Sequence, residues 1–196
     1  LISAAGVPVA APSANRFGCI SPTTAEHVRQ QFGSVSPLVL DGGPCQVGVE
    51  STVVSADEHD IVVLRPGGIT LEELNVVVGD VLLAGTDDTK PVSPGQLTRH
   101  YAPTTPLHRG GSRSLFADAD RVGLLTLCTL EDTAPGDTAE YAAVEVLSPT
   151  GCLREAATNL FAAMRRLDAQ QLDAIIATPV PEEGLGLAIM DRLRRA

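Results

Sequence analysis

The chain has 196 residues, 44% of them hydrophobic, so it is long enough to bury a sizeable core. The chain has 14 basic and 24 acidic residues. The resulting net charge of −10 disfavours broad electrostatic binding to a nucleic acid backbone. No apolar run reaches the roughly 20 residues of a membrane-spanning helix, and residues 1–12 lack the pattern of a secretion signal. These features predict a folded, cytoplasmic protein that does not enter a membrane.

The first part of the chain predicts short strands and brief helices in the α+β manner. Residues 1–6 are typical of the last turn of a helix that ends at Gly6. The predicted strands are 7–10, 38–41, 51–56 and 61–64. Two helices are predicted from capping boxes, one over 23–33 with the pair Thr23 and Glu26, the other from the pair Thr70 and Glu73 to about residue 79.

The second part of the chain shows a different pattern. Residues 85–111 are polar with spaced prolines and predict a linker, so we expect domains at 1–84 and 112–196 on either side of it. After the linker, the predicted order is strand 121–127, strand 143–147, helix 152–170, strand 174–177 and helix 185–195. This alternation predicts a small, Rossmann-like α/β domain with a parallel sheet. The helix over 152–170 carries one apolar stripe, which we expect in the core.

Cysteines and histidines show no arrangement typical of a metal site. The four cysteines lie far apart without a CxxC pair, and the four histidines lack i, i+4 spacing. We therefore expect free thiols and no metal-ligating residue. The chain has a single lysine, Lys90, so a bound phosphate would depend on arginines, hydroxyls and backbone N–H groups.

Three segments are rich in residues that could bind a ligand. Residues 10–16 lead to Ser21 and Thr23 at a predicted helix N-terminus, where free N–H groups favour an anion. Residues 41–44 and 47–53 combine glycines with the Ser51–Thr52 pair at the mouth of a strand. Arg65 ends a strand and could make a bidentate contact to phosphate or carboxylate. Each segment also has a purely structural interpretation, as a helix cap, a hairpin loop and a solvated arginine, and spacing does not decide between them.

Taken together, the order of these segments resembles the YrdC superfamily. The matching segments are Ala10–Arg16, Ser21–Thr23, Asp41–Gly43, Val49–Thr52 and Leu64–Gly67. The stretch Ser93–Pro103 resembles the linker of the longer, two-domain threonylcarbamoyl-AMP synthases. The resemblance extends from Pro8 to Arg195. It implies the second part of an α+β catalytic domain, followed by the linker and the α/β domain.

The resemblance implies a nucleotidyltransferase reaction. Threonine and bicarbonate give a carbamate whose oxygen attacks the α-phosphorus of ATP, so that pyrophosphate leaves and threonylcarbamoyl-AMP forms. No covalent enzyme intermediate is expected, so the protein would act by positioning and by stabilising phosphate charge together with Mg²⁺. The product would pass to partner proteins that modify adenosine in tRNA.

The resemblance also assigns binding residues, with no residue acting as a catalytic acid, base or nucleophile. The implied ATP contacts are Ser13, Ser21, Arg65 and Tyr101. The implied threonine contacts are Ala11, through its backbone, and Ser51. Neighbours with less defined roles are Asn15, Arg16, Thr52 and His100. The linker that holds His100 and Tyr101 is expected to lie over the pocket and exclude water. No residue of 112–196 is expected to be catalytic.

One departure from the family pattern bears on activity. In the family, strands and helices that carry a phosphate-binding lysine and arginine precede the segment that matches Leu1. We therefore expect a chain that lacks the N-terminal part of the catalytic domain and does not catalyse the reaction alone. The alternatives are an RNA-binding module, a carbamoyl-transferring relative and a non-catalytic interaction protein. The acidic charge and the 3% aromatic content argue against RNA binding.

Overall fold

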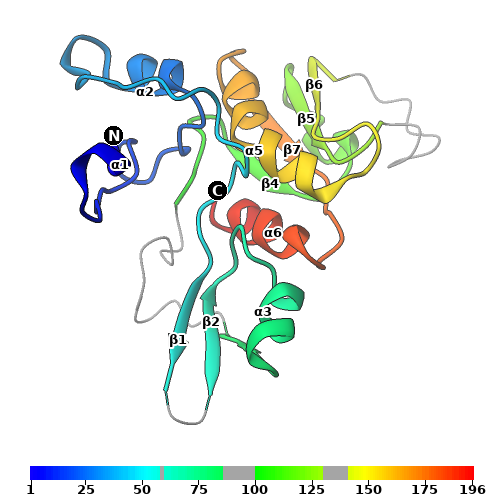
Figure 1. Cartoon of the computed structure of the whole chain (residues 1–196). Coiled ribbons are helices and arrows are strands. Elements are labelled where there is room, and N and C mark those ends of the chain that lie inside the picture. The colour runs from blue at the N-terminus through cyan, green and yellow to red at the C-terminus, as the bar shows by residue number, and fades with distance from the viewer. Residues whose placement is uncertain (58–59, 86–99, 130–140) are drawn as a thin grey trace.

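The computed structural model describes residues 1–57, 60–85, 100–129 and 141–196. Within these residues the strands form two sheets, a small one made from the first part of the chain and a parallel one made from the second. Figure 1 shows helix α6 between the two sheets, with the C-terminus near the middle of the molecule. None of the described helices is long and apolar enough to cross a membrane.

The N-terminal helices agree with the prediction except at one cap. Helix α1 (Ile2–Ala5) ends at Gly6 in the left-handed conformation, as predicted. Helix α2 (Ala25–Phe32) is followed by the short 3₁₀ helix η1 (Gly33–Val35). The predicted pairing of Thr23 with Glu26 is wrong, because Thr24 is the N-cap and its hydroxyl accepts a hydrogen bond from the His27 N–H. Thr23 instead approaches the His27 ring, since its N–H donates to Nδ1 at 3.2 Å.

The predicted strands at 7–10 and 38–41 do not form. Both segments are irregular and expose their apolar side chains, among them Val7 at 59% and Leu38 at 90%. A strand is stable only when another strand pairs with it and one of its faces is covered. Alternating or aliphatic residues alone therefore gave the wrong prediction here.

The small sheet is a hairpin with one added strand. The predicted strands at 51–56 and 61–64 form as β1 (Val53–Ala56) and β2 (Ile61–Arg65), which pair antiparallel, and β3 (Leu82–Leu83) lies parallel to β2. Helix α3 (Leu71–Val78) connects β2 to β3. Its predicted capping box is confirmed, because the Thr70 N–H donates to Glu73 at 2.8 Å while the Glu73 N–H donates to the Thr70 hydroxyl at 3.2 Å. Strand β3 was not predicted, since two residues carry no pattern.

The second part of the chain forms the predicted parallel α/β unit. Its strands are β4 (Leu107–Arg109), β5 (Val122–Thr126), β6 (Ala143–Val146) and β7 (Ala174–Ala177), in the order β4-β7-β5-β6. Its helices are η2 (Arg113–Phe116), α5 (Leu153–Asp168) and α6 (Leu185–Arg195). Strand β4 falls inside the range 85–111 that was predicted as linker, where three residues between polar neighbours gave no signal. Most of that linker, including Lys90 and Ser93–Arg99, lies outside the described residues.

The main core lies where α5 and α6 pack on this sheet. The predicted apolar stripe of α5 is confirmed: Leu160, Met164 and Leu167 are fully buried, and Leu153 at its start is partly buried. Ile20 from the first part of the chain and Tyr101 from the linker belong to the same core. Because burying one such side chain contributes about 1.5–3 kcal/mol, this core fixes both segments against the α/β unit.

Candidate functional site

A pocket of about 680 Å³ opens in the first part of the chain. Its lining includes Ser13, Ser21, the first turn of α2, the loop 39–50 and the ring of Phe161 from α5. Of the predicted ATP contacts, Ser13 and Ser21 therefore face this pocket. Both parts of the chain contribute to the lining of the pocket, since Phe161 belongs to the core of the α/β unit.

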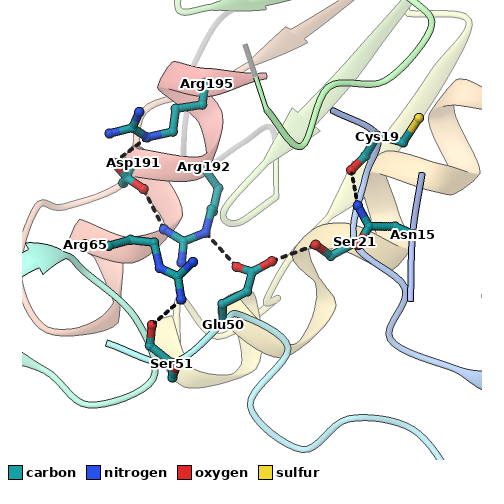
Figure 2. Close-up of polar contacts among 9 residues, drawn as sticks. All are labelled: Asn15, Cys19, Ser21, Glu50, Ser51, Arg65, Asp191, Arg192 and Arg195. Atoms are coloured by element: carbon teal, nitrogen blue, oxygen red, sulfur yellow. Dashed lines mark hydrogen bonds and ion pairs between the residues drawn. The ribbon is translucent and has the colours of Figure 1, made fainter. Parts of the chain in front are cut away.

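Glu50 joins the three predicted segments at one edge of the pocket. Its carboxylate accepts a hydrogen bond of 2.6 Å from the Ser21 hydroxyl, and its backbone carbonyl accepts one of 2.9 Å from the Gly68 N–H. Ser51 follows it directly in the chain. Segments that are far apart in the sequence thus meet at one residue, Glu50, as Figure 2 shows for Ser21.

An arginine from the last helix completes this junction. The Arg192 Nε donates to Glu50 at 2.7 Å, and its Nη1 donates to Asp191 at 2.5 Å (Figure 2). Asp191 also accepts from the Arg195 Nε at 3.0 Å. Burial by itself would raise the pKa of Glu50, but the charge of Arg192 and the hydrogen bonds from Ser21 and Arg192 outweigh it and lower that pKa. Glu50 is therefore held as a carboxylate.

Arg65 and Ser51 lie beside this junction. The buried guanidinium of Arg65 donates to the Ser51 carbonyl at 2.9 Å (Figure 2). The Ser51 side chain itself is exposed. Thr52 has a structural partner, because its hydroxyl donates to the Ile69 carbonyl at 2.5 Å and accepts from the Ile69 N–H at 3.0 Å. These bonds hold the start of the Arg65–Gly68 loop against residues 50–52.

The described end of the linker is docked rather than loose. Tyr101 is 1% exposed and has a positive φ of 62°, and its ring stacks on Phe161 with the centroids 5.6 Å apart. The Arg192 guanidinium lies 5.0 Å from the centre of the same ring, and the His100 ring contacts it edge-on at 4.1 Å. Burial raises the pKa of Tyr101. A nucleotide could reach this ring only if part of the packing opened.

Helix α5 holds the same two segments from the other side. The Arg165 guanidinium donates to the carbonyls of Ile20 and Ser21 and to the side chain of Gln31. The Asp168 carboxylate accepts the N–H groups of Thr104 at 3.1 Å and Thr105 at 2.8 Å. The Ser21 loop and the end of the linker are therefore both fastened to one helix of the α/β unit.

The remaining predicted residues do not belong to the pocket lining. Ala11 and Arg16 are exposed on the irregular segment that follows α1. Asn15 is half-buried and shapes its own turn, since its side-chain amide donates to the carbonyls of Arg16 at 3.0 Å and Cys19 at 3.2 Å. The His100 N–H donates to the Arg195 carbonyl at 2.8 Å. Each of these residues remains a predicted contact.

Sequence reasoning missed three residues that build the site, namely Glu50, Arg165 and Arg192. Glu50 stands within the Val49–Thr52 motif, so the motif itself marked it. Arg192 follows Leu185 and Ile189 at i+7 and i+3 on the buried face of α6, and an arginine in such an apolar stripe is a signal for a buried partner. Arg165 gave no signal, because its partners are backbone carbonyls more than a hundred residues away.

The described residues contain no group of three or more His, Cys, Asp or Glu side chains that could hold a metal ion. They therefore do not offer a protein cage for Mg²⁺. A magnesium ion that is bound mainly by substrate phosphates and water needs few protein ligands.

The chain matches known families and structures over its whole length. Residues 69–196 match a family described as "Threonylcarbamoyl-AMP synthase, C-terminal domain", and residues 1–67 match one described as "Telomere recombination". Threonylcarbamoyl-AMP synthases from Bacillus subtilis and Pyrococcus abyssi are 40% and 37% identical to the chain and are matched over all of it. The chain spans 59% of the length of each.

The chain is also similar to a solved structure of this family. The crystal structure of P. abyssi Sua5 complexed with L-threonine is 34% identical, with a TM-score of 0.81. The match covers 100% of this chain and 59% of that one. The likeness therefore includes both parts of the chain.

Proposed function

Because the chain belongs to the threonylcarbamoyl-AMP synthase family, we propose that it acts in making threonylcarbamoyl-AMP from L-threonine, bicarbonate and ATP for tRNA modification. The reaction is a nucleotidyl transfer: a threonine carbamate oxygen forms a bond to the α-phosphorus while the bond to pyrophosphate breaks. The protein's part is to bind, orient and exclude water. Mg²⁺ would supply charge to the phosphates, and no protein residue is assigned to it.

The observation that carries the proposal is the junction at Glu50. In a member of this family, the Ser21, Ser51 and Arg65 segments meet within hydrogen-bonding distance of one another beside a pocket of about 680 Å³. Hydroxyls, backbone N–H groups and a guanidinium suit the phosphate charge of ATP. We assign the nucleotide to Ser13, Ser21 and Arg65, and to Tyr101 in a state in which the packing around its ring has opened.

Ser21 has a defined part in this proposal. The Ser21 hydroxyl has one O–H group, and it donates its hydrogen bond to Glu50. A phosphate oxygen must therefore compete with the Glu50 carboxylate for this hydrogen bond. The Arg65 guanidinium orients residue 51 through the Ser51 carbonyl, and we assign its charge to a phosphate of ATP.

Threonine is assigned to the Ala11 backbone and to Ser51. The exposed Ser51 hydroxyl supports this, and P. abyssi Sua5 has been solved with L-threonine bound. Asn15, Arg16, Thr52 and His100 are proposed as neighbours, with Thr52 acting through the fold of its loop. Transfer of the product to tRNA-modifying partners and a cytoplasmic location remain parts of the same proposal.

Calorimetric titration of the chain with L-threonine and with ATP tests the assignment. Ser51→Ala should weaken threonine binding by about 1 kcal/mol, the usual contribution of one hydrogen bond, and leave ATP binding nearly unchanged. Ser55→Ala, at an exposed serine of β1, is the matched control and should bind as the unchanged chain does. Failure of the unchanged chain to bind either ligand would refute the proposal for this polypeptide.

A further inference from the structure

We propose that Arg192, on the last helix of the α/β unit, is a positioning residue for the site, orienting Glu50 and Ser21 and holding Tyr101 beside them. The inference rests on the proposed function, since it concerns the same site. It gives the α/β unit a defined role in binding, although none of its residues carries a sequence motif for one.

Burial and bonding single out this arginine. Its side chain is 0% exposed, and it contacts Glu50 from the first part of the chain, Asp191 from its own helix and Tyr101 from the linker. Arg192 thus contacts the first part of the chain, the linker and its own helix at the same time. The carboxylate it holds is the one to which Ser21 donates.

The geometry requires a guanidinium. Nε reaches Glu50 at 2.7 Å while Nη1 reaches Asp191 at 2.5 Å, and the planar group still faces the Tyr101 ring. A lysine has one nitrogen and no plane, so it can neutralise Glu50 but cannot make this fork and stack on the ring. The Nη2 of Arg192 is buried and makes no hydrogen bond to the described residues.

Stability alone is a weak explanation for this arrangement. A buried ion pair often contributes no more than apolar side chains of similar volume, because both charges lose their hydration. What apolar packing cannot do is hold a carboxylate at a fixed angle, and the angle of Glu50 decides where the Ser21 hydroxyl points. The effect of Arg192 should therefore be seen in local order and ligand affinity.

Helix α6 extends the coupling to the linker. The Arg195 side chain bonds to Asp191, and its backbone carbonyl accepts the His100 N–H at 2.8 Å. The last turn of α6 thus contacts both the Glu50 junction and the His100–Tyr101 pair. A substitution at residue 192 should therefore change the local order of both the Glu50 junction and the His100–Tyr101 pair.

The experiment uses the full chain and four variants: Arg192→Met, Arg192→Lys, Glu50→Gln and the double variant of Arg192→Met with Glu50→Gln. Arg194→Met is the matched control, since it lies on the same helix and loses a partly exposed ion pair to Glu182 rather than a contact to Glu50. Circular dichroism first establishes that each variant is folded. Amide hydrogen exchange is then followed at 19–23, 49–52 and 100–103, and L-threonine and ATP are titrated by calorimetry.

We expect Arg192→Met and Arg192→Lys to lose exchange protection at all three segments and to weaken binding at least about tenfold, the size of a coupling energy of 1.4 kcal/mol. The double variant should be no worse than Arg192→Met, because Glu50 acts through the same contact. Arg194→Met should behave as the unchanged chain does. If Arg192→Met does not fold, exchange protection and ligand binding are compared between Arg192→Lys and the unchanged chain instead.

Two results would overturn the inference: protection and affinity that are unchanged in a folded Arg192 variant, or full rescue by lysine, which would reduce the role to charge alone. If the unchanged chain binds neither L-threonine nor ATP, the proposed function fails. The exchange measurement then still decides whether Arg192 orders the three segments.

Discussion

The two parts of the molecule are held together in different ways. The described residues of the second part bury most of their apolar side chains in two clusters, whereas the first part of the chain exposes many large ones, such as Leu1, Leu38 and Val76. The first part is fastened to the second by Ile20, which belongs to the larger cluster, and by polar contacts such as those from Arg165 to the Ser21 loop and from Arg192 to Glu50. Binding geometry in the first part should therefore depend on side chains of the second.

The largest expected effect comes from the core. Leu160→Ala removes a fully buried side chain of α5 and should lower the free energy of unfolding by about 2–5 kcal/mol, through lost burial and the cavity left behind. Val76→Ala, at an exposed valine of α3, should change it by less than about 0.5 kcal/mol. Urea denaturation measures both, and equal losses would mean that the two parts do not differ as described.

The next effect tests how closely the loops of the first part approach one another. A Cβ at residue 67 would collide with the backbone of Glu50, Ser51 and Thr52, so Gly67→Ala should destabilise the chain by about 1–3 kcal/mol. Gly85→Ala is the control, because a Cβ there meets open space. Thermal unfolding compares the two, and a neutral Gly67→Ala would show that the Arg65–Gly68 loop moves freely.

An effect of similar size, but confined to one region of the chain, tests the polar contacts between the two parts. Arg165→Met removes the donors to Ile20, Ser21 and Gln31 and should cost about 1–3 kcal/mol locally, because the partly buried carbonyls lose their partner. Limited proteolysis within residues 19–32 should become faster. Arg166→Met breaks an exposed pair with Glu145, which contributes at most about 1 kcal/mol, and should leave the cleavage rate unchanged.

The smallest effect is a dependence of stability on pH. Burial, followed by the charges of Arg165 and Arg166, lowers the pKa of His27, so the folded chain takes up a proton less readily than the unfolded one. The stability contributed by neutral His27 is complete above the ordinary value of 6.5 and declines as the pH falls below it. His100 adds to the decline in the same direction, and Glu50, with its lowered pKa, adds to it in more acidic solution.

Unfolding free energies measured between pH 8 and pH 5 check this sign. His27→Gln should make the loss of stability at low pH smaller, since glutamine can still accept a hydrogen bond from the Thr23 N–H without taking up a proton. His108→Gln, at an exposed residue of β4, serves as the control and should keep the full decline. A decline as steep in His27→Gln as in the unchanged chain would contradict the assignment.

Much of the fold could be predicted where the sequence pattern and the burial agree. Strand β7 and helix α6 have the predicted bounds, and β5, β6 and α5 begin or end within two residues of them. The strands at 7–10 and 38–41 were wrong because their apolar residues find no partner strand in the described part of the chain. An aliphatic segment forms a strand only where a neighbouring strand can pair with it.

The sequence by itself determined the family, the parallel α/β unit and the segments that carry Ser21, Ser51 and Arg65, because each depends on residues close together in the chain. The tertiary structure decided that Glu50 joins those segments and that Arg165 and Arg192 fix them from the α/β unit. These contacts link residues more than a hundred positions apart in two cases, and local spacing carries no information about such partners. A buried charge finds its partner only when the whole chain has folded around it.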